Sequence, residues 1–358
     1  MKLNRLSDGL LRVIRPRWLF RARRNVPAVR RGPVSHVIIL DGTMSSIQPG
    51  EETNAGLIYK LLSELSGPEI SVYYEGGVQW TSWKNTHEVL MGRGINRQIR
   101  RAYGYLASRY RPGDRIYLFG YSRGAYAVRS LAGVLDRVGL LRTDAATERN
   151  VQLAYRHYQA ENESEASRAF AAANCHPGVQ IEMIGAFDTV KSLGLRLPML
   201  WKLSEPNHSF HNHALSHCVK AGFHALALEE TRAVYAPVMW SSDPDWSGRL
   251  EQVWFAGAHG DVGGQLGGFE EARGLSNLPL VWMLLQSELR GLPLPDGWRR
   301  RFPTDPDAPS VGMWRSWGKL FLIREKRVMG QDPSERIHES AIARGLQFPV
   351  SGQRQRNA

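Results

Sequence analysis

The feature that most constrains this chain is a serine between two glycines, placed where a strand pattern gives way to a helix pattern. An apolar run at 115–119 precedes Gly120-Tyr121-Ser122-Arg123-Gly124, and small residues follow as far as 135. The five-residue motif is common by chance, but a strand-to-helix junction is a rare position for it. Glycine has no Cβ, so the backbone can turn sharply here and hold a hydroxyl above a sheet. The sequence therefore predicts a serine nucleophile, Ser122, at the carboxyl end of a strand.

Alternating strand-like and helix-like runs from residue 36 onward predict an α/β fold with a mostly parallel sheet and helices on both faces. The predicted strands are 37–40, 70–74, 115–119, 180–186, 234–240 and 252–256. Helical patterns cover 98–110, 122–135 and the polar stretch 148–173, whereas 193–217 fits neither pattern. We expect one large domain over 35–347, preceded by a basic arm at 1–34 and followed by a loose tail at 348–358.

The basic charge of the chain is concentrated in this arm. Residues 1–34 hold ten Lys and Arg against Asp8 alone, which accounts for +9 of the formal net charge of +12. The remaining chain is nearly neutral, which argues against a nucleic-acid surface built into the fold. Leucines and aromatic residues interleave with the arginines, a composition suited to an anionic membrane surface. A solvated tail or a helix docked on the domain is the alternative.

Composition excludes several other classes of protein. Two cysteines, Cys175 and Cys218, are too few for a disulfide framework or a four-thiolate zinc site. No window approaches the roughly 18 consecutive apolar residues of a membrane span, and arginines interrupt the apolar runs near the start. We therefore expect a cytoplasmic protein without an export signal, with peripheral membrane contact through the arm as a variant.

A histidine-rich stretch is the competing site for metal chemistry. His213 and His217 have the i, i+4 spacing of ligands on one helical face, and more candidates lie nearby, namely His208, His211, Cys218 and His224. The H-E-x-x-H pattern is missing, and no carboxylate lies between the two histidines. We predict no metal and no cofactor.

A serine nucleophile needs a base, and the base needs an orienting acid. His259 follows a strand pattern in a glycine-rich loop and lies after the serine, which makes it the best base of the eleven histidines. Asp188 ends a predicted strand at the carboxyl edge of the sheet, where ligands of open α/β sheets bind. Other carboxylates remain as rivals for the acid, namely Glu229, Glu230, Asp243, Asp245 and Asp261.

An oxyanion hole should combine two backbone N–H groups near the serine. One is the N–H of Arg123, and the other is predicted to be that of Gly42, in the loop after the first strand. This loop could also be a simple turn. Asp41 and Thr43 beside Gly42, and Asp261 beside the base, are the predicted contacts to substrate. Asp41 could instead bind a hydroxyl or hydrogen-bond within the loop.

Taken together, these blocks resemble the α/β-hydrolase family typified by the catalytic domain of type VI secretion phospholipase effectors. The matching stretches are 39–43 (ILDGT), 72–76, 110–126, 185–190 (GAFDTV), 224–232, 254–264 (WFAGAHGDVGG) and 275–278. The resemblance implies an α/β-hydrolase fold and a triad of Ser122, Asp188 and His259, which favours Asp188 over its rivals. It also implies a lipid substrate and an alternative location, export by a type VI route without a signal peptide.

The sequence thus predicts a serine hydrolase that cleaves carboxylic esters, with a lipid or phospholipid ester as the substrate. A soluble esterase of small acyl esters and a non-catalytic, membrane-associated protein that retains the fold are the two alternatives.

Overall fold

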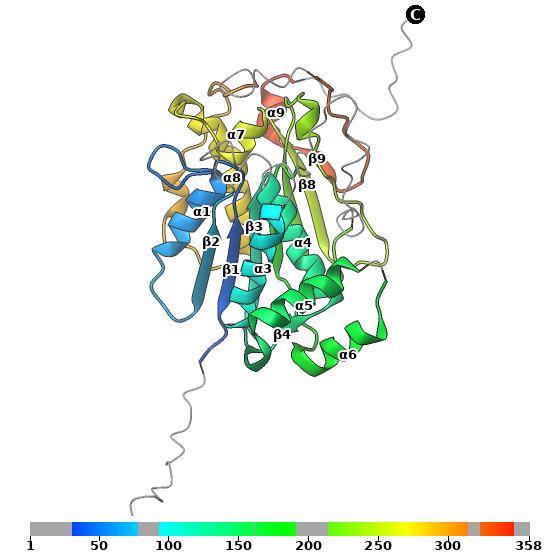
Figure 1. The fold of residues 1–358 in the computed structure, drawn as a ribbon. Coiled ribbons are helices and arrows are strands. Elements are labelled where there is room, and N and C mark those ends of the chain that lie inside the picture. Colours follow the sequence, from blue (N-terminus) through cyan, green and yellow to red (C-terminus); the bar gives the residue numbers. More distant parts are fainter. Residues whose placement is uncertain (1–30, 78–92, 161, 191–213, 314–322, 347–358) are drawn as a thin grey trace, which may run out of the picture. The chain divides into compact units, whose positions relative to one another are not determined.

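A seven-stranded parallel sheet runs through the described part of the molecule (Figure 1). The computed structural model describes residues 31–77, 93–160, 162–190, 214–313 and 323–346. Every neighbouring pair in the sheet is parallel. In spatial order the strands are β2 (Ile70–Glu75), β1 (Ser35–Leu40), β3 (Arg115–Tyr121), β6 (Met183–Phe187), β7 (Ala221–Ala227), β8 (Arg249–Phe255) and β9 (Glu335–Ile337). A separate antiparallel pair joins β4 (Leu140–Leu141) to β5 (Cys175–His176). The predicted α/β class is confirmed.

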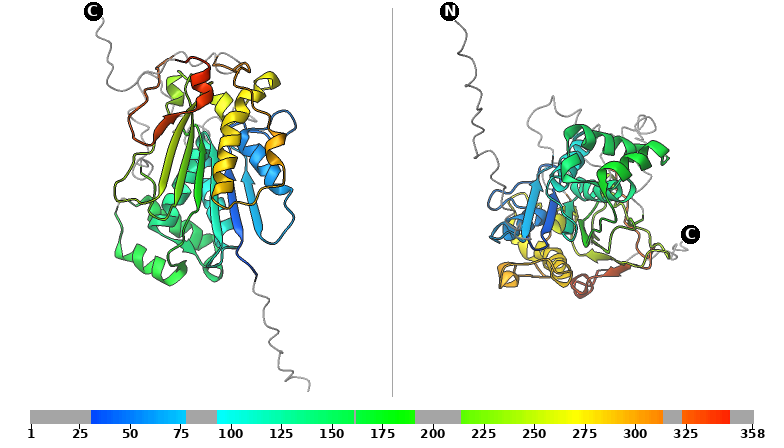
Figure 2. Two further views of the ribbon diagram at one scale, coloured as in Figure 1. Left: turned by 180° about the vertical axis from the view of Figure 1, so that it is seen from behind. Right: turned by 90° about the horizontal axis from the view of Figure 1, so that it is seen from below.

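Helices cover both faces of this sheet, because the strands are apolar on both sides. Ile38 and Leu40 of β1 belong to a buried cluster with α3 (Arg93–Ala107), α4 (Arg123–Arg137) and α5 (Glu148–Gln159). Val37 and Ile39 belong to the opposite cluster, with α1 (Asn54–Ser63) and α8 (Arg273–Leu289). Figure 2 shows these two layers from behind and from below. The other helices are α6 (Glu165–Asn174), α7 (His259–Gly263) and α9 (Glu339–Ala343), with 3-10 turns at η3 (Thr143–Ala145), η5 (Ala233–Tyr235), η6 (Glu270–Ala272) and η7 (Trp298–Arg301).

The register of the strands places several of the predicted site residues at one edge of the sheet. Leu40 is opposite Gly120, and Tyr121 is opposite Phe187. The residues that follow these strand ends are Asp41, Ser122 and Asp188. In a parallel sheet all carboxyl ends lie on the same edge, so these residues lie at one edge although they are far apart in sequence.

Two local predictions were wrong and one strand was missed, and each has a physical reason. The predicted strand 234–240 contains Pro237, which cannot donate to a ladder, and the chain there forms η5 and an isolated bridge instead. The strand lies earlier, at β7, in a stretch for which the sequence predicted neither a strand nor a helix. The helical stretch 148–173 is divided into α5 and α6, and Ser164 caps the second helix by accepting the N–H of Ser167.

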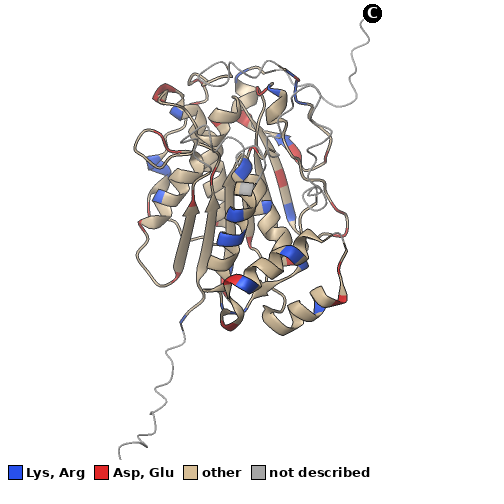
Figure 3. Ribbon diagram, viewed as in Figure 1, with Lys and Arg blue, Asp and Glu red and all other residues tan. Residues whose placement is uncertain are grey.

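Charges of both signs alternate over most of the fold, and α3 is an exception (Figure 3). This helix carries four arginines, at 93, 97, 100 and 101, and no acidic residue. Within the described ranges, no helix is both long and apolar enough to cross a bilayer.

The packing of α4 on β1 generates a stability prediction. A Cβ on Gly124 would overlap the carbonyl oxygen of Leu40, whereas one on Gly104 of α3 would lie 3.6 Å from Val151 Cγ2, an ordinary contact. We expect Gly124→Ala to push α4 off the sheet and lower the free energy of unfolding by about 1–3 kcal/mol. Gly104→Ala is the matched control and should raise it by about 0.5–1 kcal/mol. Urea denaturation measures both, and equal effects would contradict this close approach.

Candidate active site

Ser122 lies on a sharp turn between β3 and α4. Its backbone has φ 56° and ψ −119°, a strained conformation for a residue with a Cβ. A Cβ on Gly120 would lie 2.6 Å from the backbone of Ala125, so glycine is required where the helix doubles back over the strand. The turn therefore holds the hydroxyl at the carboxyl edge of the sheet and at the N-terminus of a helix.

His259 and Asp188 complete a hydrogen-bonded trio with Ser122. His259 Nε2 lies 3.0 Å from Ser122 Oγ, and His259 Nδ1 lies 2.6 Å from Asp188 Oδ2. A carboxylate can only accept, so Nδ1 carries the proton and Nε2 is left to accept from the serine hydroxyl. All three residues are buried, at 7% exposure or less. The structure brings together the three residues that the sequence indicated.

The imidazole of His259 is fixed from both sides. Its ring centroid lies 4.9 Å from that of Tyr121 and 4.6 Å from that of Tyr235. The backbone N–H of His259 donates to Glu230 Oε2 at 3.2 Å, and Arg232 pairs with the same carboxylate. We predicted that His259 lies in a glycine-rich loop, but it is the first residue of α7. Two aromatic rings and one backbone bond thus leave the ring little freedom to rotate.

Arg327 is a residue of this site that sequence reasoning missed. Its Nη1 donates to Asp188 Oδ1 at 2.6 Å, and its Nη2 donates to Asp188 Oδ2 at 2.9 Å. Burial alone would raise the pKa of Asp188, but the charge of Arg327 and the hydrogen bonds from His259 and Arg327 outweigh it and hold this pKa well below its ordinary value. Arg327 lies in a polar run with no strand or helix pattern, so nothing in the sequence signalled its burial.

The rival carboxylates have other partners or lie outside the trio. Glu230 accepts from Arg232 and from the backbone of His259, while Glu229 accepts the N–H of Gly257 at 2.7 Å. Asp245 is exposed and Asp243 is half-buried. Asp188 is therefore the carboxylate that contacts the His259 ring.

The loop after β1 is held by hydrogen bonds of its own. The N–H of Gly42 donates to Asp41 Oδ1 at 2.7 Å, so an oxyanion would have to compete for it. Asp41 Oδ2 accepts from Thr53 at 2.5 Å and from Tyr74 at 2.8 Å, and Thr43 O accepts from Gln265 at 3.2 Å. These bonds hold Asp41 within the loop, as in the alternative that the sequence left open, while its contact with substrate stays a prediction.

Asp261, another predicted substrate contact, has three hydrogen-bond partners within the protein. Its Oδ2 accepts the N–H of Ala258 at 2.8 Å and the hydroxyl of Ser310 at 2.5 Å, and its Oδ1 accepts the N–H of Val311 at 2.7 Å. The side chain is buried and ties the turn before His259 to residues 310–311. Asp261 thus anchors the base.

Arg123 follows the serine at the first position of α4, where backbone N–H groups have no partner within the helix. Gly42 is close by, since a Cβ on it would lie 3.3 Å from Ser122 Cβ. The Arg123 side chain is buried, and burial lowers its pKa to about 10, so it remains cationic near neutral pH. The N-terminus of α4 favours negative charge developing beside Ser122.

In the described ranges, no three His, Cys, Asp or Glu side chains gather as metal ligands. Of the predicted histidine cluster, His208, His211 and His213 lie outside the described residues. His224 is buried in β7, and its Nε2 accepts the N–H of Thr189 at 3.1 Å. Burial and the charge of Arg129 lower the pKa of His224 to about 3, so it stays neutral.

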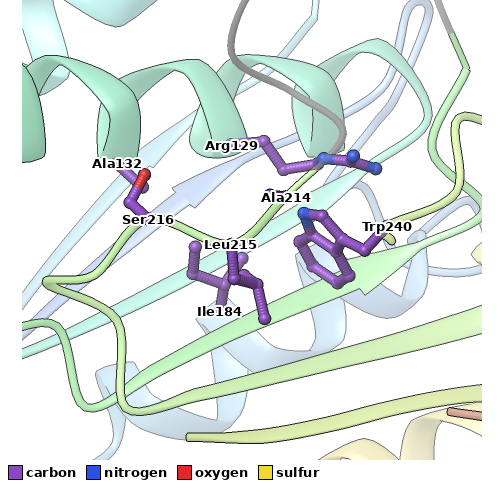
Figure 4. Close-up of a pocket in the computed structure, with 7 residues that line it drawn as sticks. All are labelled: Arg129, Ala132, Ile184, Ala214, Leu215, Ser216 and Trp240. Atoms are coloured by element: carbon purple, nitrogen blue, oxygen red, sulfur yellow. The ribbon is translucent and has the colours of Figure 1, made fainter. Parts of the chain in front are cut away.

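A small crevice borders α4 away from the trio (Figure 4). The guanidinium of Arg129 lies 4.4 Å from the centroid of the Trp240 ring and donates to the carbonyls of Val238 and Met239. None of the trio lines this crevice; the lining residues are Arg129, Ala132, Ile184, Ala214, Leu215, Ser216 and Trp240. It is therefore no part of the candidate active site.

Comparison with known proteins gives one family match and several more distant similarities. The family model described as "T6SS, Phospholipase effector Tle1-like, catalytic domain" matches residues 35–286. An uncharacterized protein of Saccharomyces cerevisiae, YEL023C, is 26% identical in an alignment of 234 residues that covers 58% of this chain. The chain spans 33% of the length of that yeast protein.

Two solved structures are also similar. An uncharacterized protein from Pseudomonas aeruginosa is 16% identical with a TM-score of 0.45, over 76% of this chain and 49% of that one. The Tle1 effector bound to the VgrG spike of the type 6 secretion system is 17% identical with a TM-score of 0.31, over 65% of this chain and 51% of that one.

The buried Asp41 generates a pH prediction. Burial raises its pKa to about 6 against four hydrogen bonds that lower it, with Thr53, Gly42, Tyr74 and Ser45. The folded protein therefore holds this proton more tightly than the unfolded chain, so its contribution to stability is complete below about pH 4 and lost as pH rises through 6. The free energy of unfolding should fall by about 3 kcal/mol more in wild type than in Asp41→Asn between pH 4 and pH 7.

Chemical denaturation at several pH values measures this difference. Asp245→Asn, which removes an exposed carboxylate, controls for the change in net charge. A wild-type to Asp41→Asn difference that stays constant with pH would show that Asp41 does not titrate in this range.

Proposed function

The chain belongs to the family of Tle1-like phospholipase effector catalytic domains, and from that premise we propose that it is a serine hydrolase of lipid esters. The observation that carries the proposal is the continuous hydrogen-bonded chain from Ser122 Oγ through His259 to Asp188. A nucleophile, a base and an orienting acid in this order are what acyl transfer requires.

In the proposed mechanism, Ser122 Oγ attacks the ester carbonyl while His259 Nε2 takes its proton. The ionised Asp188 stabilises the imidazolium, and the backbone N–H of Arg123 donates to the oxyanion. Collapse of the tetrahedral intermediate expels the alcohol, which receives the proton from His259 and leaves an acyl-serine. A water molecule then attacks the acyl-serine with His259 again as base, which releases the carboxylic acid and restores the hydroxyl.

Two features support a lipid substrate at a membrane. The family is one of phospholipase effectors, and the arm at 1–34 combines ten Lys and Arg with leucines and aromatic residues. We propose that the arm attracts the chain to anionic lipid, and that delivery follows the type VI route of the family.

The proposed nucleophile generates a prediction about catalysis. Ser122→Ala should abolish labelling by a fluorophosphonate probe and lower kcat for ester hydrolysis by about 10³-fold or more, because the attacking oxygen is gone. Vesicles of phosphatidylglycerol and phosphatidylcholine, and a soluble butyrate ester, serve as the two substrates.

Ser108→Ala removes an exposed serine hydroxyl and is the matched control, which should label and turn over like wild type. Labelling of Ser122→Ala at the wild-type rate would sink the serine mechanism. Turnover of the butyrate ester without turnover of phospholipid would identify a small-ester esterase.

The proposed membrane role of the arm at 1–34 generates a prediction about vesicle binding. Glutamine should replace six of its arginines in the full chain, namely Arg12, Arg15, Arg17, Arg21, Arg23 and Arg24. Each basic residue near an anionic surface contributes about 1 kcal/mol, so binding to phosphatidylglycerol vesicles should weaken at least about 100-fold. Butyrate hydrolysis should change less than about twofold. Lysine at the same positions keeps the charge and is the control. Equal vesicle binding by both variants would remove the membrane role from the arm.

A further inference from the structure

We propose that Arg327 is a positioning residue for hydrolysis, which clamps the Asp188 carboxylate so that one oxygen faces His259. This inference rests on the proposed function. It assigns a role in the reaction to a side chain 41 residues beyond the end of the family match at residue 286.

The guanidinium of Arg327 is bonded to three separate parts of the site. Besides its two bonds to Asp188, Nη1 donates to the carbonyl of Ala227 at 2.7 Å and Nη2 donates to the carbonyl of Tyr235 at 2.6 Å. Ala227 ends β7, and Tyr235 ends η5 and stacks on the His259 ring. One planar group therefore fixes the acid, the strand beside it and the segment that holds the base.

The chain around Arg327 is itself anchored on either side. Ahead of it, the carbonyl of Ile323 accepts the N–H of Ala233 at 3.0 Å, and the N–H of Glu325 donates to the carbonyl of Thr231 at 2.7 Å. After it, Met329 is buried in a cluster with Leu226 and Trp254. Residues 323–329, which we call the strap, thus run along the connection from β7 to η5. The strap places the guanidinium of Arg327 against Asp188.

The acid needs such support because its backbone and its burial both cost free energy. Asp188 has φ 40°, a left-handed conformation that is uncommon for a residue with a Cβ, and its side chain is fully buried. Its Oδ1 accepts from Ala227 N–H at 3.0 Å as well as from Arg327, and its Oδ2 accepts from Arg327 and His259. A buried ion pair adds little stability compared with apolar packing, so its main effect here is geometric.

The charge of Arg327 has a second consequence for the relay. Only an ionised carboxylate is purely an acceptor. A protonated Asp188 could donate its own hydrogen to His259 Nδ1, and the ring would then no longer be held in the tautomer that leaves Nε2 free to accept from Ser122. Arg327 holds the pKa of Asp188 low, so without it the loss of activity on the acidic side should begin at higher pH. The other titratable or charged groups packed around the pair and the imidazole are His224 of β7, Tyr121 of β3, Tyr235 of η5 and the Glu230–Arg232 pair.

The test measures kcat and KM for a soluble ester from pH 4 to pH 9 in full-length variants. Arg327→Gln should lower kcat about 10- to 100-fold with KM changed less than about twofold, because small misplacements act on the chemical step. Its acidic limb should move up by about one pH unit or more. Arg327→Lys keeps the charge but not the two-pronged geometry, so its limb should stay near that of wild type while kcat falls.

Arg336→Gln is the matched control, because it removes another arginine ion pair of the same region, with Glu251, away from the trio. It should leave both kcat and the pH profile unchanged. A purely structural Arg327 would reduce the folded fraction without moving the acidic limb. Wild-type kcat and pH dependence in folded Arg327→Gln would overturn the clamp.

A double variant keeps the test decisive where Arg327→Gln leaves an unpaired buried carboxylate and does not fold. Asp188→Asn with Arg327→Gln removes both charges, and it should match Asp188→Asn alone in kcat within about twofold, because Arg327 acts through Asp188. A further loss of tenfold or more would overturn the proposal. A wild type that neither labels nor hydrolyses would overturn the proposed function and the clamp together, whereas an active wild type with an indifferent Arg327 overturns the clamp alone.

Discussion

The parallel register of β1, β3 and β6 is the constraint on which the site depends. Because Tyr121 of β3 lies opposite Phe187 of β6, the residues that follow these two strands, Ser122 and Asp188, emerge beside one another at the edge of the sheet. A slip of one residue would turn these side chains to the other face. The apolar alternation of β1, with Val37 and Ile39 toward one helical layer and Ile38 and Leu40 toward the other, stabilises this register on both faces. The geometry of the trio is thus a consequence of core packing.

The sequence predicted the site best at positions where the backbone geometry requires one particular residue type. The glycines around Ser122 and before His259 mark positions that no larger residue can occupy, and Gly257 has φ 101°. Reasoning failed at β7, where Ala221–Ala227 mixes small residues with His224 and has no strong strand signal. That strand is specified by its neighbours, since both of its faces are covered and Phe223 packs against Trp282 of α8. Arg327 was missed for a related reason, because the burial of a charge depends on partners distant in sequence.

Two buried arginine–carboxylate pairs contact His259, one at its imidazole ring and the other at its backbone. Arg327 with Asp188 faces the ring nitrogen Nδ1, while Arg232 with Glu230 faces the backbone N–H of His259. Each pair is close to neutral as a unit, so the ring lies among dipoles and not beside an isolated charge. Fixed dipoles of this kind need little reorganisation when charge develops during a reaction.

The position of Arg327 bears on where the functional unit of this family ends in this chain. The family match covers β1 through most of α8, and it includes the trio and the aromatic rings around the base. The last strand, β9, pairs with β8 only after the strap at 323–329 has crossed the β7 to η5 connection. Residues 323–337 therefore do two things at once, since they extend the sheet and place a cation against the acid. A fold can be recognised without that segment, but the electrostatics of its site cannot be derived without it.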